Sequence, residues 1–304
     1  DNLMTRLAPV HIVIVMMTRW HVDDPIGRIK KREEEPDYPI HWDHIHFKAR
    51  EEQPDGSYHY LFLERFPESW YINQFARNAY SAAALLQGEP VAKGGNLFAV
   101  DEIQIVDEIP TGLKQARGWD LASSIKERDT DDPDYTCGIK GAYAEEATDI
   151  DGEAVLLPWL YVEDCKYGQW EAPERDQEIR QTAGSDGPGC WVGVETVAGY
   201  KDTGTRLKAA LQGRALVRVQ NVHHDKVFRA EELEPIVKAG RLLMKRASWN
   251  TWLLEQLRQF PLGKHDDGVD ALHTMYTTSK ARYDRTRGFG TSAATGKGAF
   301  GAKC

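Results

Sequence analysis

One stretch of the sequence decides the fold: Gln115-Ala116-Arg117-Gly118-Trp119-Asp120-Leu121-Ala122. Its apolar residues predict a buried strand over 115–121, and this strand carries a carboxylate, Asp120. A second stretch of the same kind, over 190–197, places Glu195 among Trp, Val and Gly residues. A carboxylate inside an apolar strand is costly unless it pairs with a cation or holds a metal ion. The two strands therefore predict a functional site as well as a core.

A third group of acids begins the last predicted helix, which we expect over 266–279. The residues are His265-Asp266-Asp267-Gly268-Val269-Asp270. Asp266 and Asp270 share one helix face by their spacing, and Asp267 and Asp270 are also neighbours on the helix surface. The positive end of the helix dipole tolerates this negative charge. Carboxylate ligands of this kind suit Mg²⁺ or Mn²⁺, and two such ions can clamp a scissile phosphate.

Each carboxylate also has a purely structural interpretation. Asp120 could cap a loop at the end of its strand, and Glu195 could pair with a buried Arg or Lys. Asp266 could be the N-cap of the last helix, a position that Asp fills well, while Asp267 and Asp270 could lie on a solvated helix face. Their order is the stronger signal: a strand Asp, a strand Glu about 75 residues later and a helix Asp about 70 residues beyond.

The chain around these acids alternates between strands and helices. We expect further strands over 135–143, 154–166 and 215–222, and helices over 173–182, 204–211, 230–239 and 249–259. The strands over 135–143 and 154–166 continue the sheet as a meander. Strands that lead into alternating helices and strands predict an α/β fold, with a mixed sheet covered by helices.

Three regions follow from composition and periodicity. Residues 1–95 begin with an apolar strand over 10–17, contain a helix over 70–86 and end in a Gly-rich linker over 91–95. Residues 96–282 form the α/β domain. Residues 283–304 are rich in Gly, Ala, Ser and Thr, which predicts a flexible tail. The chain opens without Met and almost directly into a strand, so we expect a piece of a longer protein.

The bulk composition excludes some classes of protein. No apolar run approaches the ~20 residues that a membrane-spanning helix needs. The formal net charge of −9 argues against a protein that coats DNA through bulk positive charge, but it allows an enzyme that holds cations between itself and DNA. Four cysteines without a C-x-x-C pair indicate free thiols in a reducing compartment.

Taken together, these segments resemble the large subunit of tailed-bacteriophage DNA-packaging terminases. The segments that carry the resemblance, in family order, are Thr18-Arg19-Trp20-His21 with Asp23-Asp24 and Gly27-Arg28, then Pro90-Val91 with Lys93-Gly94-Gly95 and Leu97-Phe98, Arg117 to Ala122, Val194-Glu195, Lys226 with Arg229-Ala230 and Gly240-Arg241, and Phe260-Pro261 through Leu272. The match covers roughly residues 10–280. It implies a ribonuclease-H-like, resolvase-like nuclease domain over 96–282, with the end of the ATPase domain and its linker in 1–95.

The resemblance also implies roles for the acidic residues. The first two catalytic and metal-binding acids correspond to Asp120 and Glu195. The third metal ligand falls on Asp266, with Asp267 beside it, and Asp270 stays an alternative that spacing alone does not settle. The cofactor would be Mg²⁺ or Mn²⁺, with two ions in the presence of substrate.

Several basic residues and partners complete the prediction. Lys201, Lys226 and Arg229 are candidates for contacts with DNA phosphates, with ordinary surface charge as the alternative. The partners implied by the resemblance are double-stranded DNA, the portal protein and the small terminase subunit, with no membrane. The location would be the host cell cytoplasm, with transient docking on the procapsid.

The predicted function is a metal-dependent endonuclease that cuts concatemeric viral double-stranded DNA during genome packaging. The sequence contains no G-x-x-x-x-G-K-[ST] phosphate loop, so we expect no ATPase activity from this chain alone. A junction resolvase or transposase of the same fold would lack the segments at 18–28 and 90–98. A motor and portal docking module with a silent nuclease would bind little divalent metal at Asp120 and Glu195. A translocase in its own right would need the missing phosphate loop.

Overall fold

The computed structural model describes residues 12–78, 81–90, 97–122, 133–150, 152–196, 201–221 and 226–291 of the 304-residue chain. Contacts divide the chain into two compact units. The first, here the N-terminal unit, comprises Asp1–Gly94 with Asp149–Val155, and the second, here the sheet unit, comprises Gly95–Thr148 with Leu156–Cys304. The acidic residues singled out in the sequence all belong to the sheet unit.

The N-terminal unit is built from short elements. They are α1 (Pro25–Glu33), β1 (Arg50–Glu52), β2 (Tyr58–Tyr60), α2 (Glu68–Arg77) and a π-helical turn (Ala82–Leu86). Strands β1 and β2 pair antiparallel. Asp24 caps α1 because its side chain accepts a hydrogen bond from the Gly27 amide at 2.8 Å. A small aromatic core, which includes Tyr60 and Tyr71, holds the unit together.

Two predictions for this unit were wrong. Residues 10 and 11 lie outside the described residues, and 12–17 form no strand; Ile12, Ile14 and Met16 are 84–94% exposed. The apolar run reads as a buried strand, but no described strand pairs with it. The single helix expected over 70–86 is interrupted, since α2 ends at Arg77 and the backbone of Asn78 is non-helical. The linker predicted over 91–95 lies outside the described residues.

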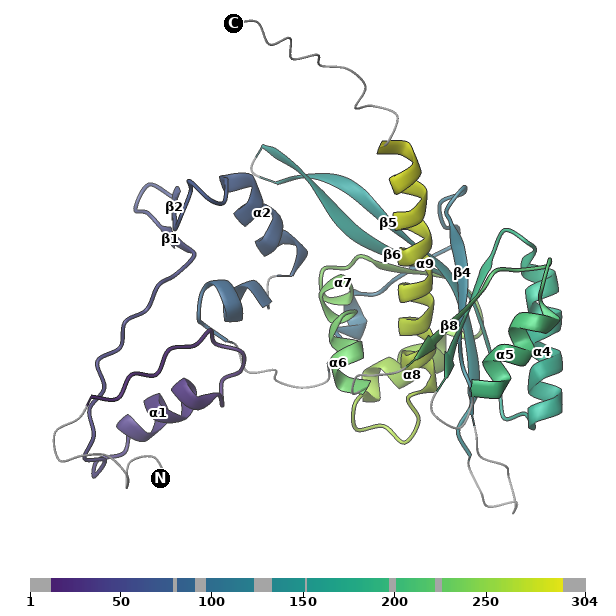
Figure 1. The fold of residues 1–304 in the computed structure, drawn as a ribbon, viewed down its shortest axis with the longest axis horizontal. Coiled ribbons are helices and arrows are strands. Elements are labelled where there is room, and N and C mark those ends of the chain that lie inside the picture. The colour runs from purple at the N-terminus through teal and green to yellow at the C-terminus, as the bar shows by residue number, and fades with distance from the viewer. Residues whose placement is uncertain are drawn as a thin grey trace, which may run out of the picture. The chain divides into compact units, whose positions relative to one another are not determined.

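The sheet unit contains a seven-stranded sheet in the order β3-β9-β6-β5-β4-β7-β8. Figure 1 shows α9 on one side of this sheet and α4 and α5 on the other. The strands are β3 (Gln104–Val106), β4 (Gln115–Asp120), β5 (Thr136–Ile150), β6 (Glu153–Gly168), β7 (Trp191–Thr196), β8 (Val217–Asn221) and β9 (Leu242–Lys245). Strand β4 pairs antiparallel with β5 and parallel with β7. Strand β8 is parallel to β7, and β9 is parallel to both β6 and β3.

Helices cover both faces of this sheet. They are α4 (Ala172–Asp186), α5 (Lys201–Ala210), α6 (Lys226–Glu231), α7 (Glu234–Lys238), α8 (Asn250–Gln259) and α9 (Asp267–Thr291). One core cluster joins Trp119 and Val194 to Ile179 of α4 and Leu207 of α5. The other cluster joins β5, β6 and β9 to α7, α8 and α9. The unit is therefore a mixed sheet between two layers of helices, which confirms the predicted α/β class with a mixed sheet covered by helices.

Three details of the sheet unit differ from the prediction. The helix expected over 230–239 is two short helices, α6 and α7. Strands β3 and β9 were not predicted, because three or four residues are too short to show a period. Helix α9 does not end near Ser279 but continues to Thr291. Tyr143 packs edge-on against Tyr283 at 5.3 Å, which explains the extension, and 292–304 lie outside the described residues.

Among the described residues, no helix combines the length and the apolar character that crossing a bilayer requires.

Candidate metal centre

Parallel pairing of β4 and β7 places two of the predicted acids side by side. Trp119 of β4 is the register partner of Val194 of β7, so the next residues of the two strands, Asp120 and Glu195, are neighbours. Both strands reach this point in the same direction. The acids therefore share the carboxyl end of the sheet, where ligand sites of parallel strands usually form.

Two glycines let α9 lie directly against this pair of strands. Gly118 and Gly193 are register partners, and each stands two residues before the acid of its strand. A Cβ atom at Gly118 would collide with the α9 backbone at Met275, and one at Gly193 would collide with the Thr278 hydroxyl. Side chains two residues apart point to the same face of a strand. The two acids therefore face α9.

The first turns of α9 bring a third carboxylate to this place. Carboxylate oxygens of Asp120, Glu195 and Asp270 all lie within 4.8 Å of one another, and Asp270 is only 4% exposed. Burial raises the pKa of Asp120 well above its ordinary value, and the charges of Asp270 and Glu195 raise it further. Burial also raises the pKa values of Glu195 and Asp270, although Arg229 opposes both shifts. The raised pKa values show that nearby cations do not fully compensate the negative charge of the three carboxylates.

Two cations from α6 balance part of this negative charge. The Arg229 guanidinium donates to Glu195 and lies 3.0 Å from Asp270 Oδ1. The Lys226 ammonium donates to Asp266 Oδ1 at 2.7 Å and lies 3.5 Å from Asp270 Oδ2. Burial disfavours the charged form of Lys226, but the hydrogen bond to Asp266 and the charge of Asp270 outweigh it, so the Lys226 pKa is raised.

A second group with metal-ligand geometry adjoins the first. Asp134, His265 and Asp267 place ligand atoms within 4.8 Å of one another. His265 Nδ1 lies 3.7 Å from Asp134 Oδ1 and 3.8 Å from Asp267 Oδ2. Burial raises the pKa of Asp267 to about 6, against a hydrogen bond from the Tyr135 backbone. The charge of Asp267 also raises the pKa of Asp120, which links the two groups electrostatically.

Both groups fit a divalent cation. The first offers three carboxylates, which are hard ligands of the kind that Mg²⁺ and Mn²⁺ prefer. In the second, Asp267 is buried, and its Oδ2 atom has no hydrogen-bond partner among the described residues. A buried acceptor without a donor is costly, and a cation would satisfy it.

The structure thus sorts the predicted site residues. It brings Asp120 and Glu195 together, and the helix acid that joins them is Asp270, the alternative in the sequence. Asp267 lies in the second group. Asp266 faces Lys226 at the start of α9, where its carbonyl accepts from the Val269 and Asp270 amides. The side chain of Lys201 lies outside the described residues.

Sequence reasoning missed two features of the site. Asp134 was not singled out, since an acid before a strand carries no distinctive pattern. The second feature, a glycine two residues before the acid in both strands, was visible as Gly118-Trp119-Asp120 and Gly193-Val194-Glu195. This repeated spacing is the sequence signal for a helix packed closely on the acid-bearing strands.

An aromatic hollow of about 380 Å³ lies beside the second group and shares His265 with it. Tyr135, Trp252 and Gln256 form part of its lining. Trp252 stacks on Tyr167 with ring centroids 3.8 Å apart, so one face of the indole already packs within the protein.

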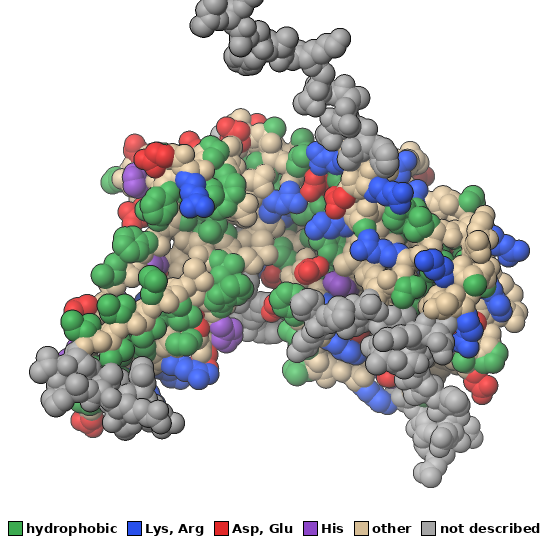
Figure 2. Space-filling view, in the orientation of Figure 1, with side chains coloured by type: hydrophobic (Ala, Val, Ile, Leu, Met, Phe, Trp, Pro, Cys, Tyr) green, Lys and Arg blue, Asp and Glu red, His purple; other side chains and the backbone are tan. Residues whose placement is uncertain are grey.

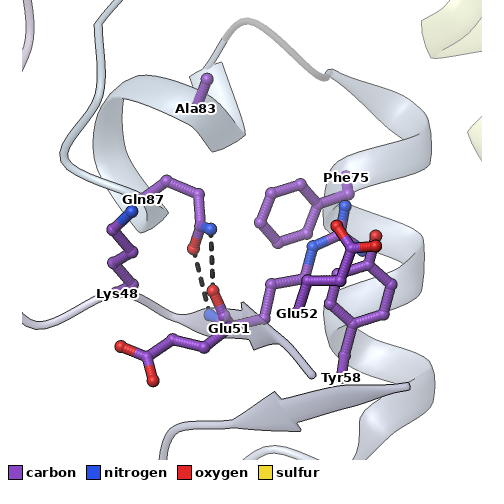
Figure 3. A pocket seen from close by; sticks show the side chains of 8 residues that line it. Lys48, Glu51, Glu52, Tyr58, Phe75, Ala83 and Gln87 are labelled. Carbon is purple, nitrogen blue, oxygen red and sulfur yellow. Dashed lines mark hydrogen bonds between the residues drawn. The ribbon is translucent and has the colours of Figure 1, made fainter. Parts of the chain in front are cut away.

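The N-terminal unit has a separate hollow of about 550 Å³ (Figure 3). The Arg50 guanidinium lies over the rings of Tyr58 at 4.2 Å and Phe75 at 3.8 Å. The Gln87 side chain exchanges two hydrogen bonds with the Arg50 backbone. These contacts join the strand to the helices of the unit, and packing accounts for them.

On the side shown in Figure 2, Lys and Arg side chains gather over the part of the sheet unit that contains α9 and α5. Exposed cations of this unit include Arg206, Arg214, Arg218, Arg285 and Arg287. The net charge of −9 therefore hides a local excess of cations, which would suit a polyanion.

Comparison with known proteins gives structural similarity alone. No protein-family model and no curated protein matches the chain. The large terminase nuclease of thermophilic phage G20c is similar at 14% identity and a TM-score of 0.38, over 60% of this chain and 98% of that chain. The magnesium-bound structure of the same nuclease has 15% sequence identity and a TM-score of 0.41, over 62% of this chain and 98% of that chain. The human cytomegalovirus terminase nuclease domain, soaked with Mn and bound to an inhibitor, has 13% sequence identity and a TM-score of 0.38. The similarity covers 55% of this chain and 83% of that chain.

Proposed function

We propose that the sheet unit is a divalent-metal-dependent endonuclease that cuts double-stranded DNA. The observation that carries the proposal is the meeting of Asp120, Glu195 and Asp270 within 4.8 Å at the carboxyl end of β4 and β7. Three like charges that raise one another's pKa are held together without enough cations to balance them. Such an arrangement is expected where a metal ion supplies the missing charge.

The clustered acids, His265, Arg229 and the exposed cations each have a role in this proposal. Asp120, Glu195 and Asp270 would hold one ion, and Asp267 with His265 and Asp134 would hold a second. The bound ions would supply an activated water and would stabilise the charge that develops on the phosphate and the leaving oxygen. Arg229 positions the Glu195 and Asp270 carboxylates through its buried guanidinium. The exposed cations of the sheet unit would bind the DNA backbone without reading its sequence.

The biological setting that we propose is viral genome packaging. The terminase segments in the sequence favour concatemeric viral DNA as substrate, with a portal protein and a small terminase subunit as partners in the host cytoplasm. A mixed sheet with acids on the adjacent parallel strands β4 and β7, and on the later helix α9, fits this assignment.

Plasmid cleavage tests the proposal. The chain is incubated with supercoiled DNA and Mg²⁺, Mn²⁺ or EDTA, and nicked and linear products are measured. Asp120→Ala should abolish cleavage, while Asp107→Asn, which changes a surface carboxylate of the same unit, should leave it unchanged. Circular dichroism establishes that each variant is folded.

The outcomes separate clearly. Metal-dependent cleavage that is lost in Asp120→Ala supports the nuclease and its site. Cleavage by Asp120→Ala at the wild-type rate would refute the metal-site assignment. A folded chain that binds neither metal nor DNA would favour a docking module.

A further inference from the structure

The two cations that contact the acids differ in exposure to solvent. Arg229 and Lys226 lie three residues apart on α6, and both reach Asp270. The Arg229 side chain is 9% exposed, and its guanidinium is shared between Glu195 and Asp270. The Lys226 side chain is 54% exposed, and its ammonium bonds Asp266 at the edge of the cluster. One cation is locked inside the site, and the other lies at its surface.

Binding of a divalent ion affects these two cations unequally. The ion and the Lys226 ammonium would compete for Asp270, because like charges repel at this separation. Arg229 cannot leave readily, because its departure would leave the buried Glu195 and Asp270 carboxylates without their cation and the guanidinium without its partners. Lys226 can leave, because a half-exposed lysine on a flexible stem regains water when its ion pair breaks.

We propose that Lys226 is the exchangeable cation of this site. It neutralises Asp266 and Asp270 before the divalent ion binds, and the ion releases it to bind a phosphate of the DNA strand. This inference rests on the proposed nuclease function. It separates the roles of the two α6 cations, since Arg229 remains as a positioning residue for Glu195 and Asp270.

The charge of the site supports the exchange. Among the ion pairs of the described residues, Lys226 and Arg229 contact Glu195, Asp266 and Asp270. Asp267 lies 3.8 Å from His265, and the pKa of Asp120 is raised by its acidic neighbours, so carboxylates outnumber cations in this site. A phosphodiester would be repelled by this excess of negative charge. Once a divalent ion covers Asp270, the site accepts an anion, and an ammonium freed from Asp266 is a point charge suited to phosphate.

The first test measures the reactivity of the Lys226 amine in the absence of DNA. An amine-acylating reagent is applied to the chain with EDTA, Mg²⁺ or Ca²⁺, and modification of each lysine is measured by mass spectrometry. Acylation of Lys226 should rise several-fold with either ion, relative to the exposed Lys238 as internal reference. Calorimetry on the same samples establishes that the ion has bound. Ion binding with unchanged or lower reactivity of Lys226 overturns the inference.

A second test uses Lys226→Met, which keeps most of the length of the unbranched side chain and removes its charge. The variant should bind Mn²⁺ about two- to fivefold more tightly, the range expected for loss of a partly exposed competing ion pair. With Ca²⁺ present, it should bind duplex DNA more weakly, with a salt slope reduced by about one phosphate contact. Weaker Mn²⁺ binding would instead make Lys226 a support of the ion and would overturn the inference.

The two proposals fail in different ways. If calorimetry detects no Mg²⁺, Mn²⁺ or Ca²⁺ binding to the wild-type chain, the nuclease proposal and this inference both fall. If the wild-type chain binds the ion and Asp120→Asn does not, the metal centre stands, and the Lys226 measurements alone decide the exchange.

Discussion

Two charged residues of strand β4, three positions apart, have opposite surroundings. Arg117 is 2% exposed, and all its nitrogens donate: Nε and Nη2 to Asp186, Nη2 also to Asp164 at 2.7 Å, and Nη1 to the Gly138 carbonyl at 2.9 Å. Asp120 lies instead among carboxylates that raise its pKa. The strand holds one charge that the fold compensates and one that it does not.

The difference separates a structural charge from a functional one. A buried charge with complete hydrogen bonding is stable but has no vacancy for a ligand. A group of acids that lacks counter-charge costs stability, and such a cost persists where the site binds a cation. The comparison predicts that the same kind of change, removal of charge, will have opposite effects at the two places.

The largest expected effect concerns the uncompensated acids, and it decides whether Asp270 or Asp266 is the third metal ligand. Asp270→Asn should lower the rate of plasmid cleavage about a thousandfold, because losing a metal-held carboxylate removes several kcal/mol of transition-state stabilisation. Asp266→Asn should cost far less, since Asp266 contacts Lys226 and stands outside the three-carboxylate group. Single-turnover cleavage with Mn²⁺ measures both rates.

Asp266→Asn also serves as the matched control, because it makes the same chemical change four residues away on the same helix. A thousandfold loss in Asp266→Asn with a small loss in Asp270→Asn would restore the ligand order that the sequence alone favoured.

The second effect concerns the compensated charge of Arg117, whose removal should destabilise the fold. Arg117→Met should lower the free energy of unfolding by about 3–5 kcal/mol, because it leaves the buried Asp186 carboxylate without its main partner. Urea unfolding of the metal-free chain measures the change. Adding Asp186→Asn to the same chain should recover part of the loss, since the uncompensated charge is then gone.

Arg206→Met is the control for this prediction. Arg206 is 63% exposed and pairs with Asp176 at 3.5 Å, so its removal should cost less than about 1 kcal/mol. If Arg117→Met cost no more than Arg206→Met, the Arg117 network would not be a stabilising element.

The sequence predicted those parts of the fold whose signal is local. Strand β4 was predicted from the apolar residues around Asp120, and β7 was predicted in the same way around Glu195. Strands β3 and β9 are too short to show alternation, and 12–17 is apolar without being paired. A local sequence pattern indicates that a segment is apolar enough to be buried, but it does not show whether another strand pairs with it.

The site was predicted in its strand acids and left open in its helix acid. Spacing places Asp266, Asp267 and Asp270 on neighbouring helix positions, and any of them could face the sheet. The rotation of α9 decides, and that rotation is fixed by contacts at Gly118 and Gly193. These contacts join segments more than 70 residues apart, so no local pattern reports them.

The smallest of the three effects reverses the sign seen at Arg117. Asp267→Asn should stabilise the metal-free chain at pH 7.5, by on the order of 1–3 kcal/mol, because the pKa of Asp267 is raised to about 6 by burial. The asparagine oxygen can still accept from the Tyr135 backbone. Thermal and urea unfolding with EDTA, at several pH values, measures the difference between variant and wild type.

The pH dependence of that difference follows from the sign of the pKa shift. A carboxyl whose pKa is higher in the folded chain binds a proton more readily there, so wild-type stability rises as the pH falls through about 6. The advantage of Asp267→Asn should therefore shrink between pH 7 and pH 4, where the wild-type carboxyl becomes neutral. The charge of Asp267 also raises the pKa of Asp120, so Asp120 titrates at a lower pH in the variant, and this change acts in the same direction. The contributions of acids that Asp267 does not affect cancel. Saturating Mn²⁺ should remove the advantage at pH 7.5, because the ion stabilises the wild-type carboxylate by binding the folded state. A variant that is less stable than wild type at pH 7.5 with EDTA would show that Asp267 is compensated like Arg117, and the contrast between the two charges would not extend to the second group.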